Sequence, residues 1–265
     1  MPALLLGFAA LSAAHAHTVG PDYIYECPAC SSFLRTGSSL SGNTIGAKIY
    51  SDGKIVAPMA PAYPNLTKCK NCDTILWLSD MKAIGTCAWG GRCEKKEWES
   101  APSAYFLEFN DLLRFLELDA VKSNKEKEKY VRIRILWSFN DNMRHIEGEI
   151  ILDSLLASLG KTGKEKSDQK METEKRIRNE KEVFIQKNKV SWEQNCQRLL
   201  ELLDTKDVDQ KIMAAELYRN LGRFDACMKL LSTVDDQDHA WIAEKLKIEC
   251  EKKNTSVIMV RSGRD

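Results

Sequence analysis

The sequence predicts an α+β protein in which a small β-rich part is followed by an all-α helical part. All seven prolines lie at or before Pro102, and nine of the fourteen glycines lie at or before Gly91. Proline and glycine favour turns and interrupt helices, so strands suit the first part and uninterrupted helices suit the second. A chain of 265 residues with 43% hydrophobic and 29% charged residues is ordinary for a globular protein and long enough for two domains. We place the boundary between the two parts near residue 100.

The charges along the chain are nearly balanced. Lysine and arginine number 39 against 38 aspartates and glutamates, and residues 17–100 carry nine basic against eight acidic side chains. A protein that binds nucleic acid usually has a strongly basic domain or face. The balance therefore disfavours nucleic acid as a partner.

The first sixteen residues have the pattern of a secretory signal peptide without its usual basic start. They carry no charged side chain and end in Ala14-His15-Ala16, a small-x-small sequence typical of a cleavage site. Their apolar core is too short to span a bilayer as a helix, and no transmembrane span is expected. Two interpretations stay open for residues 1–16, a signal peptide that directs export and a disordered tail.

Four of the nine cysteines come as two matched pairs. Each pair has the form Cys-x-x-Cys, which places two sulfurs on one tight turn, and two such turns supply the four soft ligands of a tetrahedral zinc site. The candidate metal ligands are Cys27, Cys30, Cys69 and Cys72.

The segment between the two pairs contains a hairpin signal. Two β-prone runs, 47–50 and 54–57, flank Ser51-Asp52-Gly53, and Asp-Gly favours a tight hairpin turn because both residues tolerate positive φ. The run after Cys72 contains Ile75 and Trp77 and predicts a further strand. We expect the hairpin to bring the two cysteine pairs together.

With its paired cysteines around a hairpin, the stretch from residue 24 to about 80 resembles a zinc-ribbon domain. The resemblance implies a structural Zn²⁺ held by the four cysteines, within a domain that spans residues 17–100. The sequence departs from the usual pattern in two ways. The loop between the pairs is 38 residues long, and Ser31 and Asp73 replace the glycine that often follows the second cysteine.

Two other uses of the cysteines compete with zinc binding. A thioredoxin-like redox pair lies between a strand and a helix, but the Ser/Gly-rich run after Cys30 has no helical periodicity. A disulfide framework requires export and leaves one of nine cysteines unpaired. Zinc suits a reducing compartment, so we expect a cytoplasmic protein, with export through a signal peptide at 1–16 as the alternative.

The remaining five cysteines have no standard metal-ligand spacing. Cys87 and Cys93 are interpreted as a disulfide, an auxiliary metal pair or ordinary buried thiols. Cys196, Cys227 and Cys250 fall at apolar positions of predicted helices and are expected in the core.

Residues 101–160 are expected to form helices. The run 103–119 has helical periodicity with Ser103 as a possible N-cap, and 130–160 is interpreted as helix despite an alternating start. On that helix Arg134, Asp141 and His145 would share a face with Trp137. An ion-pair row is favoured there over a charge relay, because no nucleophile converges on these residues. Residues 161–189 alternate in charge and predict either a linker or a solvated helix.

The last part of the chain, residues 190–255, has strong helical periodicity. Helices are predicted near 191–203, 207–221, 224–233 and 238–252. One stretch resembles a tetratricopeptide repeat, with its small, aromatic and glycine positions at Ala215, Tyr218, Gly222, Phe224 and Cys227. The combination of ribbon and repeat resembles bacterial proteins that join a zinc ribbon to a tetratricopeptide-like domain.

The resulting functional prediction is a non-enzymatic protein with structural zinc that binds another protein through its helical domain. A nucleic-acid-binding ribbon is the first alternative, with Tyr50, Lys54, Lys68 and Lys70 as a basic-aromatic patch. A thiol oxidoreductase that uses Cys27 and Cys30 is the second alternative. No nucleotide-binding or hydrolase motif is present in the sequence.

Overall fold

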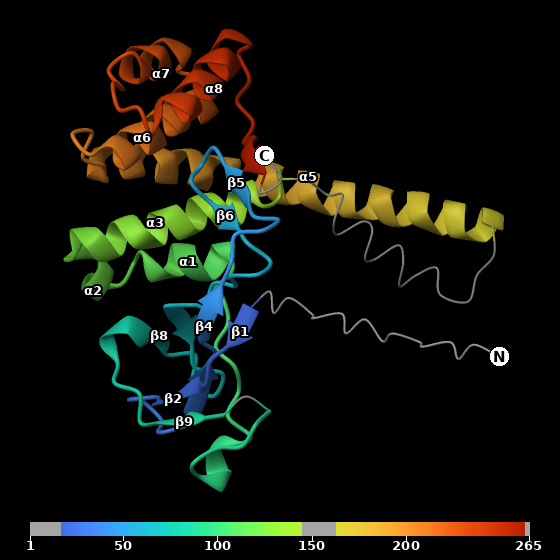
Figure 1. The fold of residues 1–265 in the computed structure, drawn as a ribbon, viewed down its shortest axis with the longest axis vertical. Helices are drawn as coiled ribbons and strands as arrows, with labels where there is room; N and C mark the ends of the chain where they lie inside the picture. The colour runs from blue at the N-terminus through green and yellow to red at the C-terminus, as the bar shows by residue number, and fades with distance from the viewer. Residues whose placement is uncertain (1–16, 89, 145–162, 263–265) are drawn as a thin grey trace, which may run out of the picture. The chain divides into compact units, whose positions relative to one another are not determined.

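The computed structural model describes residues 17–88, 90–144 and 163–262. The predicted α+β class is confirmed, since small antiparallel sheets occupy the first half and helices most of the second (Figure 1). The possible signal peptide at 1–16, His145 and the helical run 150–159 lie outside the described residues.

The chain forms two compact units. Among the described residues, the first comprises 17–47 and 57–106, and the second comprises 48–56 and those from 107 to 262. The single boundary predicted near residue 100 therefore does not separate the two units completely, because the segment 48–56 belongs with the helices that follow later in the sequence.

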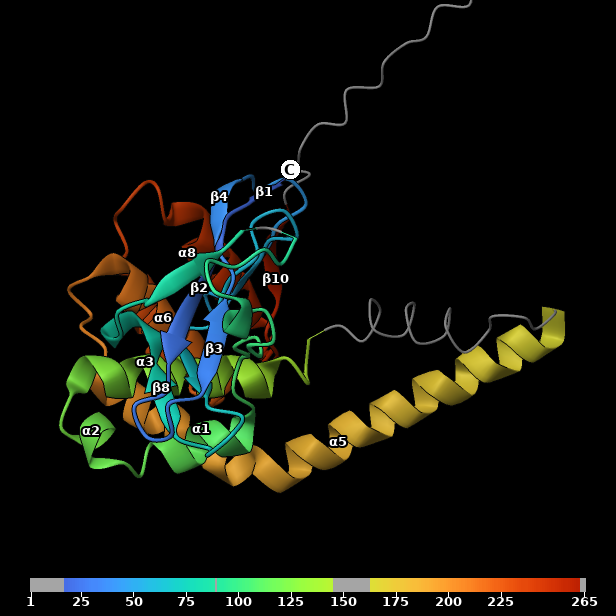
Figure 2. The ribbon, with the colours of Figure 1, turned by 90° about the horizontal axis from the view of Figure 1, so that it is seen from below.

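Three small antiparallel sheets build the first unit. The largest has the order β3-β2-β9, and β2 and β3 are visible side by side in Figure 2. The strands are β1 (His17–Val19), β2 (Asp22–Glu26), β3 (Phe33–Thr36), β4 (Ser39–Gly42), β7 (Leu66–Lys68), β8 (Ile75–Trp77) and β9 (Gly85–Cys87). Further pairs are β1 with β4 and β7 with β8, and short 3₁₀ turns cover Leu78–Asp80 and Lys96–Trp98.

Residues 102–104 run beside β3, where the sequence predicted the start of a helix. The Arg35 N–H donates to the Pro102 carbonyl at 3.0 Å, and the Ala104 N–H donates to the Arg35 carbonyl at 2.7 Å. These bonds keep the backbone extended, so Ser103 does not cap a helix. The first helix, α1 (Phe109–Phe115), begins after Glu108.

The second unit contains the helices. They are α1, α2 (Asp119–Lys122), α3 (Lys125–Asn140), α5 (Gly163–Leu202), α6 (Val208–Asn220), α7 (Phe224–Leu231) and α8 (Ala240–Glu251). Helices α6, α7 and α8 agree closely with the helices predicted near 207–221, 224–233 and 238–252. Helix α5 ends where the helix near 191–203 was predicted to end, but it begins far earlier, at Gly163. Helix α3 ends at Asn140, earlier than predicted, and residues 141–144 form turns.

Helix α5 settles the choice between linker and helix for the charged segment. It is continuous from Gly163, and its first half extends beyond the other helices of its unit in both views (Figures 1 and 2). Exposed pairs four residues apart, such as Arg176 with Glu180 at 3.1 Å, support the solvated surface.

Helix α6 ends as the sequence predicted, at a glycine. Gly222 has φ +71°, and its N–H donates to the Arg219 carbonyl at 2.9 Å. The Arg223 N–H donates to the Tyr218 carbonyl at 2.8 Å, which completes a Schellman motif. The cap turns the chain back so that α7 packs against α6.

Two apolar clusters hold the second unit together. Phe139 stacks on Trp192 with ring centroids 4.8 Å apart and also meets Phe109 and Phe184. The other cluster joins α6, α7 and α8 through buried side chains that include Ala215, Cys227, Leu231, Leu246 and Cys250.

The predicted Asp-Gly hairpin is present, but it belongs to the helical unit. Strands β5 (Lys48–Tyr50) and β6 (Ile55–Val56) pair around Gly53, whose φ is +75°. On its other edge β5 pairs with β10 (Met259–Ser262), so the sheet order is β10-β5-β6. The expectation that this hairpin would organise the cysteine pairs is therefore wrong.

Candidate metal centre

Each cysteine pair lies at the tip of its own antiparallel hairpin in the first unit. Cys27 and Cys30 join β2 to β3, and Cys69 and Cys72 join β7 to β8. The loop between the pairs is long because it contains β3, β4, the excursion of residues 48–56 and β7.

The two turns have the same backbone conformation. In the first, the Ser31 N–H donates to the Cys27 carbonyl at 2.9 Å, and Ser31 has φ +55°. In the second, the Asp73 N–H donates to the Cys69 carbonyl at 2.9 Å, and Asp73 has φ +56°. The two departures from glycine noted in the sequence therefore keep the left-handed conformation that glycine would supply.

The four sulfurs converge on one point. Cys27 Sγ and Cys72 Sγ are 3.7 Å apart, Cys30 Sγ and Cys69 Sγ are also 3.7 Å apart, and all four lie within 4.8 Å of one another. A tetrahedron of sulfurs around Zn²⁺ at about 2.3 Å has edges of about 3.8 Å. The cluster can therefore hold a metal ion.

Hydroxyl groups surround the sulfurs in a repeated arrangement. Ser32 Oγ lies 3.0 Å from Cys30 Sγ and 3.1 Å from Cys69 Sγ, and Thr74 Oγ1 lies 3.1 Å from Cys72 Sγ. Such groups orient metal ligands and stabilise thiolates. Our reading of the sequence missed them, although a hydroxyl residue stands two positions after the second cysteine of both pairs.

The pKa values of the sulfurs are pulled in opposite directions. Burial raises the pKa of the Cys27 thiol to about 12, whereas hydrogen bonds from the Asn71 side chain and from Ser32 lower the pKa of Cys30 to about 5. Four thiolates so close together would repel one another, and a bound cation removes that repulsion. A bound metal ion would therefore stabilise the arrangement.

The cluster rests on an apolar base and opens to solvent on one side. Cys27 and Cys69, the first cysteine of each pair, are buried against Leu34, Leu76 and Leu78. The second cysteines are more accessible, with Cys72 exposed. A metal ion here would lie at the edge of the unit, and the apolar side chains around Cys27 and Cys69 would hold its ligands in place.

Cys87 and Cys93 are joined by a disulfide, one of the three possibilities left open by the sequence. Cys87 ends β9 and is fully buried beside Ile24 and Trp98. The other cysteines, Cys196, Cys227 and Cys250, are buried in the helical unit as expected.

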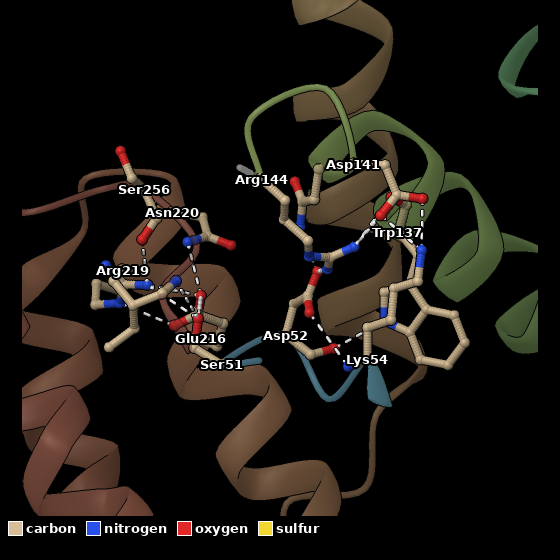
Figure 3. Close-up of polar contacts among 12 residues, drawn as sticks. Ser51, Asp52, Lys54, Trp137, Asp141, Arg144, Glu216, Arg219, Asn220 and Ser256 are labelled. Carbon is tan, nitrogen blue, oxygen red and sulfur yellow. Dashed lines mark hydrogen bonds and ion pairs between the residues drawn. The ribbon is translucent and has the colours of Figure 1, made fainter. Parts of the chain in front are cut away.

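The turn of the 48–56 hairpin carries the main buried polar network of the second unit (Figure 3). Asp52 is fully buried and pairs with Arg144, and its second carboxylate contact is the Asn140 amide at 2.8 Å. The Asp52 carbonyl accepts a hydrogen bond from Trp137 Nε1 at 2.9 Å, and Lys54 Nζ lies 2.6 Å from Asp141.

On the other side of the turn, Ser51 Oγ donates to Glu216 at 2.6 Å (Figure 3). Glu216 and Arg219 are both fully buried and paired at 2.7 Å, and Arg219 also donates to the Ser256 carbonyl at 2.8 Å. The contacts of Ser51, Asp52 and Lys54 fix the hairpin to α6, to α3 and to the turn after α3. Arg219 in turn joins α6 to the chain before β10. Of the predicted row, Asp141 follows the end of α3 and pairs with Lys54 and Arg144, whereas His145 lies outside the described residues.

The four residues of the basic-aromatic patch considered for nucleic acid are divided between the two units. Tyr50 is buried under Arg144, and Lys54 is neutralised by Asp141, both in the second unit. Lys68 pairs with Asp73 and Lys70 lies over the Tyr105 ring, both in the first unit.

Comparisons with known proteins identify no relative. No protein-family model matches the chain, no curated protein matches it, and no solved structure matches it.

Proposed function

We propose that this chain is a structural-zinc protein whose helical unit binds another protein. The observation that carries the proposal is the convergence of four sulfurs, from two hairpin tips, at distances that fit a ZnS₄ tetrahedron. Four thiolates fill the coordination sphere and leave no position for water or substrate, so the metal acts in folding and not in catalysis.

Metal analysis of the purified full chain tests the first part. We expect one zinc ion per chain, released when Cys27 or Cys69 is changed to Ser. The matched control is Cys196→Ser, a buried cysteine of the helical unit, which should keep its zinc. Because sulfur tetrahedra also suit iron, an iron-loaded and coloured protein would contradict the assignment.

A groove in the helical unit supports the second part. It has a volume of about 400 Å³ and lies between the 48–56 hairpin and helices α6 and α8. Its apolar wall includes Ile212, Met213 and Trp241, and Trp241 is 38% exposed. Two carboxylates, Asp209 and Asp238, line it, and no lysine or arginine is among its described lining residues.

These features fit a protein segment with one apolar anchor next to a basic residue. The test compares the affinity of a protein partner for the full zinc-loaded chain with its affinity for the Met213→Arg variant, in which a charge lies in the groove. Val183→Arg adds the same charge on an exposed position of α5 and serves as the control. A partner that binds Met213→Arg as well as the wild type excludes the groove.

The redox alternative is less well supported than zinc. It predicted a lowered thiol pKa, and Cys30 has one, but a thiolate poised for metal binding has the same property. Cys30 leads into strand β3 and not into a helix, and Cys69 and Cys72 crowd the pair. The chain is accordingly proposed to be non-enzymatic.

The cellular location stays a prediction. Among the described residues, no helix combines the length and the apolar character needed to cross a bilayer. A cytoplasmic protein was expected from the zinc site, whereas the Cys87–Cys93 disulfide supports the alternative of export, because disulfides persist in oxidising compartments.

A further inference from the structure

The sulfurs of Cys227 on α7 and Cys250 on α8 are 2.6 Å apart. The paired sulfurs of the metal cluster, by comparison, are 3.7 Å apart. A separation of 2.6 Å is too short for two thiols in ordinary contact and approaches the bond length of a disulfide, about 2.0 Å. Helix packing alone has brought the two atoms nearly to bonding distance.

The surroundings exclude a metal as the reason for this approach. Cys227 is fully buried and Cys250 is 3% exposed, within a cluster of apolar side chains such as Leu231 and Leu246. Two sulfurs without further ligands do not complete a zinc site. Among the described residues, the group that could hold a metal ion lies in the other unit.

We propose that Cys227 and Cys250 form a disulfide that links α7 to α8. The oxidant is a disulfide, such as oxidised glutathione. The thiolate of one cysteine attacks a sulfur of the oxidant and releases one thiol, which gives a mixed disulfide. The thiolate of the other cysteine then attacks the protein sulfur of that bond and releases the second thiol, so two protons and two electrons leave the protein.

The bond should form while the chain folds and not afterwards. Burial raises the pKa of both thiols above the ordinary value, and the attacking species is the thiolate. In the packed unit the sulfurs are also out of reach of an oxidant. Protein that has folded in reductant is therefore expected to resist later oxidation.

The proposal also assigns a state to each of the nine cysteines. Four lie in the metal cluster, Cys87 and Cys93 are bonded, and a second bond would leave Cys196 as the single unpaired thiol. Cys196 is fully buried in α5, which protects it from reaction.

Peptide mapping of the full chain tests the bond directly. The protein is unfolded in reductant, refolded with zinc in a glutathione redox buffer, alkylated in denaturant and digested with trypsin. Residues 224–229 and 248–252 are separate tryptic peptides, each with one of the two cysteines. We expect them as one linked species, lighter than their sum by two hydrogen masses and split by reductant. Recovery of both as alkylated single peptides from natively folded protein overturns the proposal.

Thermal unfolding gives a second readout, made in Cys87→Ser/Cys93→Ser so that only the proposed bond responds to reductant. With zinc in excess, reductant present during refolding should lower the midpoint by about 5–10 °C. Adding Cys227→Ala should abolish this dependence, whereas adding Cys196→Ala should leave it intact. An equal response to reductant with and without Cys227→Ala contradicts the bond.

Discussion

Ser31 and Asp73 occupy the position at which each metal-binding turn needs a left-handed backbone. The sequence identified the four cysteines from their spacing, because that spacing is a local property of a tight turn. It did not show that two residues other than glycine would take positive φ with matching hydrogen bonds. Their conformation is imposed by the hairpins on either side, which local propensity does not report.

Substitution of Ser31 measures how much the turn depends on this conformation. Ser31→Gly should keep zinc and change the free energy of unfolding by less than about 0.5 kcal/mol, since it loses strain and gains chain entropy. Ser31→Val should cost about 1–2 kcal/mol and weaken zinc binding in a chelator competition. Ser100→Val, at an exposed residue without positive φ, is the control, and an equal loss there would rule out the backbone explanation.

Asp52 is the residue on which the hairpin network depends. Asp52→Ala leaves Arg144 buried without its main partner, and the free energy of unfolding should fall by about 3–5 kcal/mol in urea titration. Glu117→Ala removes an exposed carboxylate that pairs with Lys122 and should cost less than about 0.5 kcal/mol. Similar losses of stability in the two variants would show that the buried Asp52–Arg144 pair contributes no more to the free energy of unfolding than an exposed pair.

At the scale of secondary-structure elements, the helices of the second unit were predictable and the placement of the hairpin was not. Periodicity located α6, α7 and α8, and Gly222 marked the end of α6. The hairpin itself follows from Asp-Gly, a local signal, but its partners are far away in the sequence. Ser51 bonds to Ile258 and Glu216, and no pattern in residues 47–57 indicates either contact.

The contact between α6 and the start of α8 should depend on pH through His239. Its side chain lies 2.8 Å from Asp236 and 3.0 Å from Asp209, and these hydrogen bonds raise the His239 pKa above 6.5. A raised pKa means that the stabilisation is complete below pH 6.5 and is lost as the pH rises through the value in the folded protein.

The measurement is the free energy of unfolding of the wild type and of His239→Gln at pH 6 and pH 8.5. The wild type should lose more stability over this range than the variant. An identical dependence in both proteins would show that His239 contributes nothing to it.

At the scale of the whole molecule, the described part of the chain passes between the two units three times, at residues 47–48, 56–57 and 106–107. Sequence composition detects the last passage, because all seven prolines and nine of the fourteen glycines precede it. The passages at 47–48 and 56–57 cannot be detected in this way, because the nine residues between them are too few for a change in amino-acid composition to show.

Truncation tests this division of the chain. Residues 107–262 alone lack the hairpin, so β10 loses its neighbour and Arg144 loses Asp52. We expect this fragment to unfold at lower urea concentration than the same fragment joined through a flexible linker to residues 48–56, with helicity followed by circular dichroism. Equal midpoints would mean that the excursion is dispensable for the helical unit.

The pairing of β5 with β10 has a consequence for biosynthesis. Ser51 and Ile258 are separated by 207 residues, so β5 is synthesised long before its partner β10. Until then β5 has an unpaired edge, which can form non-native strand pairs with other nascent chains. Strand β5 should therefore need protection from wrong pairing until β10 has been synthesised.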